Sequence, residues 1–137
     1  MFFNKKTENK NDNLSKVAAL LIYAAKIDEN YSNMEEKIIQ EAILKLGADE
    51  KEITKILNDA KKLEENSNQI LDFTKEVKNM NYESKIKIIE TLWQIIYSNN
   101  KVDIYEDNLM RRIAGLLYID SKIMGDIKEK VRGDNSR

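Results

Sequence analysis

The chain of 137 residues contains no cysteine, no histidine and no proline. The absence of cysteine excludes disulfides, thiolate nucleophiles and cysteine-based zinc sites. The absence of histidine excludes Ser-His-Asp and Cys-His mechanisms, and with them any metal held by imidazole. A metal held by side chains would therefore be bound through oxygen, which favours Ca²⁺, Mg²⁺ or Mn²⁺.

Long apolar runs and an excess of one charge are also missing. The longest apolar run, VAALLIYAA at residues 17–25, is much shorter than the ~20 residues that span a bilayer. The chain begins MFFNKK, with charges where a signal peptide needs its apolar region. We therefore expect a cytoplasmic protein, and a position peripheral to the inner membrane stays open. The formal net charge of −1 shows no dedicated basic face, so we expect no nucleic-acid partner.

Apolar residues recur at helical spacing from residue 14 onward, and only four glycines interrupt the chain. Strand-like alternation is lacking. The pattern predicts an all-α fold with about seven helices, at 14–27, 33–46, 50–65, 68–79, 82–98, 104–117 and 121–132. Residues 14–132 would form one domain, with flexible ends at 1–13 and 133–137. Phe2 and Phe3 in the first of these ends would either pack loosely or touch a partner or membrane surface.

Helix-start signals support several of these boundaries. Three of them have the spacing of a capping box, in which a first side chain and a Glu three residues later satisfy backbone N–H groups: Ser32-x-x-Glu35, Asp49-x-x-Glu52 and Asp103-x-x-Glu106. Gly47 follows the second predicted helix, where a left-handed residue would close it.

An internal repeat becomes visible when the chain is shifted by 71 residues against itself without a gap. Matched positions then carry similar residues in three successive predicted helices: Leu21 on Leu92, Ile39 on Met110, Ile56 on Ile127, and the pair Ser32 and Glu35 on Asp103 and Glu106. This register predicts two pseudo-symmetric three-helix units joined by the helix at 68–79. Because each unit would cover the other's apolar faces, we expect that half of the chain does not fold alone.

Two segments carry a resemblance to a known family: AAKIDENYSNMEEKIIQEAI and YSNNKVDIYEDNLMRRIAGLLYID. They resemble the TerB-like family, which comprises tellurite-resistance TerB proteins and the related N-terminal domain of DjlA-type co-chaperones. The resemblance extends from residue 14 to about 131. It implies a compact helical domain with internal pseudo-symmetry, linked to tellurite and envelope-stress systems and to membrane-associated complexes. It implies no established enzymatic activity.

The resemblance also implies a divalent-cation role for two acidic turns, in which an Asp precedes a helix-starting Glu by seven residues. In the first half, the candidate ligands are oxygen-bearing side chains before and within the second predicted helix: Asp28, Asn30, Ser32, Glu35 and Glu36. Their second-half counterparts, Asn99, Asp103 and Glu106, are interpreted as structural, because Asn99 replaces the Asp and Lys101 would repel a cation. Helix capping is the favoured interpretation of both turns, and weak cation binding at the first is the alternative.

The leading functional hypothesis is a non-enzymatic accessory domain that binds protein partners in a stress-response or membrane-associated complex. Its expected interaction surface is the acidic face formed by Asp28, Glu29, Glu35 and Glu36. One alternative is a DjlA-like regulatory module that acts in trans, since the chain lacks the His-Pro-Asp motif of a J-domain. Another is a hydrolase that uses only carboxylates. Self-association into a homo-oligomer also stays open.

Overall fold

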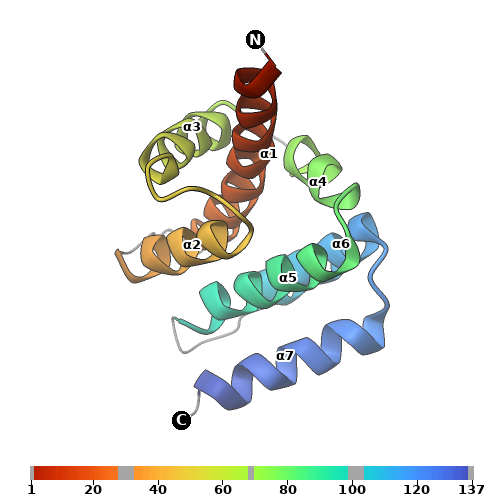
Figure 1. Ribbon diagram of the computed structural model, residues 1–137. Coiled ribbons are helices and arrows are strands. Elements are labelled where there is room, and N and C mark those ends of the chain that lie inside the picture. The colour runs from red at the N-terminus through yellow and green to blue at the C-terminus, as the bar shows by residue number, and fades with distance from the viewer. Residues whose placement is uncertain (1, 28–32, 68–69, 99–103, 136–137) are drawn as a thin grey trace.

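The computed structural model describes residues 2–27, 33–67, 70–98 and 104–135 (Figure 1). These residues form seven helices and no strand, so the predicted all-α class is confirmed. In chain order the helices are α1 (Phe2–Ala25), α2 (Asn33–Lys45), α3 (Ile53–Glu65), α4 (Leu71–Lys78), α5 (Tyr82–Tyr97), α6 (Ile104–Leu117) and α7 (Ser121–Asn135).

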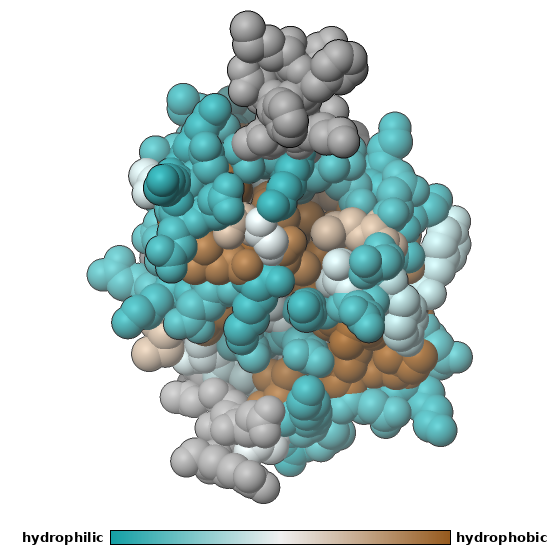
Figure 2. Space-filling view, viewed as in Figure 1, coloured by the Kyte–Doolittle hydropathy of each residue, from teal (hydrophilic) through white to brown (hydrophobic). Residues whose placement is uncertain are grey.

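The core is built around α1 and α5. From Val17 to Ile22 every residue of α1 has no exposed surface, because this helix contacts α2, α3, α4 and α5. Helix α5 carries the broad apolar face that its sequence indicates, with Ile88, Ile89 and Leu92 fully buried. Helix α3 packs mainly on α1 and α7 mainly on α5. On the face shown in Figure 2, apolar surface is exposed along the boundary between α5 and α7.

Both ends of the chain are more helical than predicted. Helix α1 begins at Phe2, so residues 2–13 continue the buried helix outward and are not an irregular tail. Helix α7 continues to Asn135, beyond the predicted end at 132. In both segments the chain lacks proline, so nothing removes a backbone donor and the helix propagates from its packed part. None of the described helices is both long enough and apolar enough to cross a membrane.

The predicted capping box at Asp49 and Glu52 is wrong. The Glu52 N–H donates to the Asp49 carbonyl oxygen at 2.9 Å, which closes a turn before the helix. Helix α3 therefore begins at Ile53, and its N-cap residue Glu52 makes no side-chain cap hydrogen bond. The other two predicted boxes begin at Ser32 and Asp103, which lie outside the described residues.

Two helix starts are capped by residues that the sequence interpretation did not single out. The Asn81 Oδ1 accepts a hydrogen bond from the Ser84 N–H at 2.8 Å, at the start of α5. The Asp120 Oδ1 accepts from the Lys122 N–H at 2.8 Å, at the start of α7. An Asn or Asp directly before a helix is the signal for such caps.

Helices α2 and α6 end in the same backbone motif. After α2, Gly47 has a φ of 112°, as predicted, and the Ala48 N–H donates back to the Ile43 carbonyl. After α6, Tyr118 has a φ of 57°, and the Ile119 N–H donates to the Ala114 carbonyl. These 6→1 bonds next to a left-handed residue form a Schellman motif.

The two Schellman motifs lie 71 residues apart, because Gly47 and Tyr118 are matched in the register of the proposed repeat. The buried first-turn acids Glu35 and Glu106 are matched in the same register. Both observations support a duplicated three-helix unit, which stays a prediction.

Candidate functional site

The described part of the candidate site consists of the first turns of α2 and α6. Each turn carries two adjacent acids, Glu35 and Glu36 in α2, and Glu106 and Asp107 in α6. The first acid of each pair is buried: Glu35 has no exposed surface and Glu106 is 4% exposed. A carboxylate in the first turn is stabilised by the partial positive charge of the helix N-terminus. The helix N-terminus therefore helps to stabilise the buried carboxylate in each of the two turns.

The second acid of each pair forms an ion pair with a lysine of the third helix in its half. The Lys61 Nζ lies 2.9 Å from a Glu36 carboxylate oxygen, joining α3 to α2. The Lys128 Nζ lies 3.2 Å from an Asp107 oxygen, joining α7 to α6. Nothing in the sequence pattern identified these lysines, because they lie 25 and 21 residues from their partners. An ammonium group at this distance competes with a cation for the same oxygen, which argues against Glu36 as a strong metal ligand.

An aromatic pair lies beside the second of these ion pairs. The rings of Trp93 and Tyr97 on α5 are 6.0 Å apart, and the Lys128 Nζ lies 5.2 Å from the centre of the Trp93 ring. Burial raises the pKa of Tyr97 above its ordinary value, against the opposing effect of Lys128 and Arg132. Trp93, Asp107 and Lys128 of this aromatic and ionic cluster also line a groove of about 440 Å³ between α6 and α7.

The predicted cation site is only partly described. Asp28, Glu29, Asn30, Ser32, Asn99 and Asp103 lie outside the described residues. Within the described ranges, no three acidic side chains come together in a group that would hold a metal ion. The structure places Glu35 and Glu36 together at the start of α2 and Glu106 at the start of α6. Cation binding at the first acidic turn stays a prediction.

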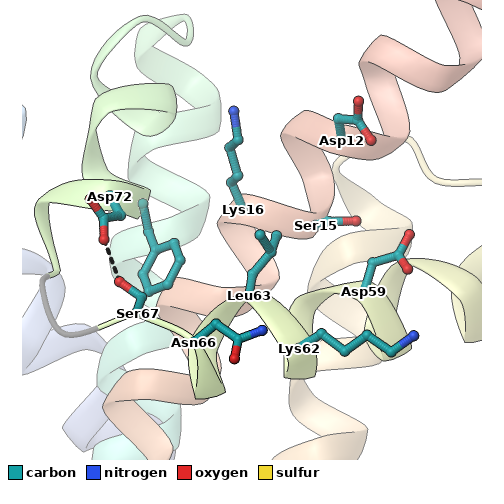
Figure 3. Close-up of a pocket in the computed structure, with 10 residues that line it drawn as sticks. Asp12, Ser15, Lys16, Asp59, Lys62, Leu63, Asn66, Ser67 and Asp72 are labelled. Atoms are coloured by element: carbon teal, nitrogen blue, oxygen red, sulfur yellow. Dashed lines mark hydrogen bonds between the residues drawn. The ribbon is translucent and has the colours of Figure 1, made fainter.

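A groove of about 630 Å³ lies between α1, α3 and α4. Figure 3 shows its polar lining, which includes Asp12 and Lys16 on α1, Asp59 and Lys62 on α3, and Asp72 on α4. Three aspartates and two lysines line this groove, and Ser67 donates to Asp72 at one end. The mixed charges favour no single class of ligand.

A smaller groove, of about 420 Å³, lies between α4 and the end of α6. Its lining contains two lysines and no acid: Leu71, Thr74, Lys75, Lys78, Gly115, Leu116 and Tyr118. The sequence interpretation did not identify this groove, because it joins residues about 40 positions apart.

Comparison with known proteins assigns the chain to a family. The family model described as "Tellurite resistance protein TerB" matches residues 14–129, from the buried part of α1 into α7. No curated protein and no solved structure matches the chain. The match spans most of the chain and includes both acidic helix starts. This all-α chain therefore belongs to the TerB family of tellurite-resistance proteins.

Proposed function

We propose that this chain is a non-enzymatic TerB-family accessory domain that binds protein partners in a stress-response or membrane-associated assembly. The observation that carries the proposal is the family match over residues 14–129. The composition supports it, because a chain without histidine and cysteine lacks the side chains most often used as bases and nucleophiles at neutral pH.

The proposed partner surface is the acidic face at the start of α2. Of its four acids, Glu36 is partly exposed and Glu35 is buried. A partner would therefore contact Glu36 together with Asp28 and Glu29, while Glu35 would serve to hold the helix start in place. Charges at the rim of an interface mainly set the association rate and the choice of partner.

Affinity capture of the tagged full chain from a native lysate, followed by chemical crosslinking and mass spectrometry, tests this proposal. We expect a captured protein whose crosslinks fall near residues 26–37. The D28N/E29Q variant should lose it, and the control variant E50Q/E65Q should retain it, since Glu50 and Glu65 are exposed acids outside this face. Wild-type protein that enriches nothing above a tag-only control would contradict the proposal. Capture of an Hsp70-type chaperone would instead favour a co-chaperone module acting in trans.

Cation binding at the first acidic turn is a separate part of the proposal. If a divalent cation binds there, its role would be to order the acidic face for the partner. Calorimetric titration with Ca²⁺, Mg²⁺ and Mn²⁺ should then give heat with wild-type protein and much less with the D28N/E35Q variant. Absence of heat from all three ions in the wild type would exclude this role.

A further inference from the structure

Helix α4 presents an exposed face that carries apolar and basic side chains but no acid. Leu71 is 46% exposed, and Lys75 and Lys78 are exposed on the same side, at spacings of four and seven residues. The opposite side of the helix is buried through Phe73 and Val77. Leu71 is thus left in solvent by the packing of its own helix.

The two acids of α4 are turned away from this face and engaged elsewhere. Asp72 accepts a hydrogen bond from Ser67, and Glu76 forms an ion pair with Lys16 of α1 at 3.1 Å. Lys75 and Lys78 therefore keep their positive charge unneutralised by the acids of their own helix.

The end of α6 completes the groove with a small residue and an exposed ring. A side chain added at Gly115 would meet no atom within 4 Å, so the protein's own packing does not require glycine there. Tyr118 is 74% exposed and holds a left-handed φ of 57°. This conformation is unfavourable for a non-glycine residue, and burial of the exposed ring does not compensate for it.

Lys78 of α4 contacts the end of α6, since its Nζ lies 4.8 Å from the centre of the Tyr118 ring. On the neighbouring helix α5, the Lys85 Nζ donates to the Leu117 carbonyl at 3.3 Å, adding a third positive charge near the end of α6. The groove thus has an apolar lining and a basic rim.

From this geometry we propose that the groove between α4 and α6 docks an acidic amphipathic helix of a protein partner. The apolar side chains of that helix would cover Leu71 and Tyr118, and its carboxylates would pair with Lys75 and Lys78. Laying the apolar stripe of a helix into an apolar groove is a common mode of peptide recognition. This inference rests on the proposed function as a protein-binding domain but assigns a second surface, opposite in charge to the acidic face.

The small number of lysines at the groove favours a peptide over an anionic membrane. Each lysine adds only a modest attraction to an anionic lipid surface. The few lysines here would give marginal binding to lipid, whereas an acidic helix in the groove also buries Leu71 and Tyr118.

Fluorescence anisotropy with labelled model peptides tests the proposal on the full chain. The probe is an amphipathic peptide of about 16 residues with leucines at helical spacing and glutamates on the other positions. A peptide with lysine in place of every glutamate serves as the reversed-charge probe, and vesicles with and without phosphatidylglycerol serve as the lipid probe. We expect the wild type to bind the acidic peptide and to bind neither the basic peptide nor either vesicle comparably.

Two variants locate the binding. The K75E/K78E variant should bind the acidic peptide at least about tenfold more weakly, a difference of about 1.4 kcal/mol. The matched control K51E/K55E changes the net charge equally at exposed lysines before and within α3, and should bind within about twofold of the wild type. The G115L variant should also lose binding, because Gly115 lines the groove and a Cβ there meets no atom within 4 Å, so the leucine side chain would extend into the space that the peptide occupies. Circular dichroism of each variant checks that it remains folded.

Equal binding of both peptides, equal loss in K75E/K78E and in the control, or binding to anionic vesicles alone would overturn the assignment of this groove. These outcomes are distinct from a failure of the proposed function. If the K75E/K78E protein bound the acidic peptide as tightly as the wild type while both captured the same cellular partner, the protein-binding function would stand and the groove assignment would be wrong.

Discussion

At the scale of single residues, the two left-handed C-caps provide a matched comparison. Gly47 adopts its φ without a Cβ penalty, whereas Tyr118 adopts its φ in spite of one. Tyr118 also contacts Lys78 through its ring, which at an exposed site contributes about 0.5–1 kcal/mol.

We therefore expect Gly47→Ala to lower the free energy of unfolding by about 1 kcal/mol. Tyr118→Gly should raise the free energy of unfolding, by up to about 1 kcal/mol, because the relieved backbone cost exceeds the lost ring contact. Urea denaturation of the two variants and the wild type measures both effects. A Tyr118→Gly variant that is clearly less stable than wild type would show that the ring contributes more than its exposure suggests.

Tyr97 gives a prediction about alkaline pH. Its pKa in the folded protein is raised by burial above the ordinary value of 10.0. The unfolded chain therefore releases the phenol proton at lower pH than the folded protein, and the stability contributed by the neutral ring is present below pH 10 and lost as the pH rises through the folded pKa.

The wild type should consequently lose stability more steeply than Tyr97→Phe between about pH 9 and 11. Thermal melts at closely spaced pH values measure how steeply the stability of each protein falls with pH. Subtracting the Tyr97→Phe curve from the wild-type curve removes the titration of the lysines, which both proteins share. Parallel curves for the two proteins would mean that Tyr97 ionises equally easily in the folded and unfolded states.

At the scale of elements, the helix starts show how far local patterns predict structure. Each predicted helix exists, and α6 has the bounds predicted for it. The pattern at Asp49 and Glu52 matches a capping box, but the turn formed by their backbone delays α3 until Ile53. A capping pattern is necessary for such a cap, but the backbone dihedral angles before the helix decide whether it forms.

The caps observed in the structure predict the outcome of alanine substitutions. Asn81→Ala removes the acceptor of the Ser84 N–H and should cost about 1 kcal/mol of stability. Asp49→Ala removes no side-chain cap of α3 and should stay within about 0.5 kcal/mol of wild type. Chemical denaturation of the two alanine variants side by side makes the comparison. A loss of stability clearly larger than about 0.5 kcal/mol for Asp49→Ala would indicate that the Asp49 side chain does cap α3.

At the scale of the whole molecule, the two predicted units are joined through their cores. Helix α1 contacts α5 directly, and α2 also packs on α5. Residues such as Leu21 and Ile22 have no exposed surface in the complete chain. Removal of the second half would expose much of this apolar surface to water, at about 25 cal/mol for each Å².

We therefore expect the separate fragments 1–79 and 80–137 to lack cooperative unfolding transitions. Mixing the fragments should restore part of the helical signal, because each supplies the missing apolar face of the other. Circular dichroism and thermal melts of each fragment and of the mixture give the answer. A cooperative melt of fragment 1–79 alone would show that the first three helices and α4 form an independent core.

The sequence by itself determined the helical class, the approximate helix positions, the left-handed role of Gly47 and the family resemblance that the TerB match confirms. These properties depend on residues close in the chain, where the period of apolar residues and the conformational freedom of glycine act locally. Tertiary structure alone decided that Lys61 pairs with Glu36 and that Lys128 pairs with Asp107. It also decided that Leu71 and Tyr118 line one groove with Lys75 and Lys78. Such contacts join helices whose relative placement follows from the packing of the entire core, and no spacing along the chain encodes them.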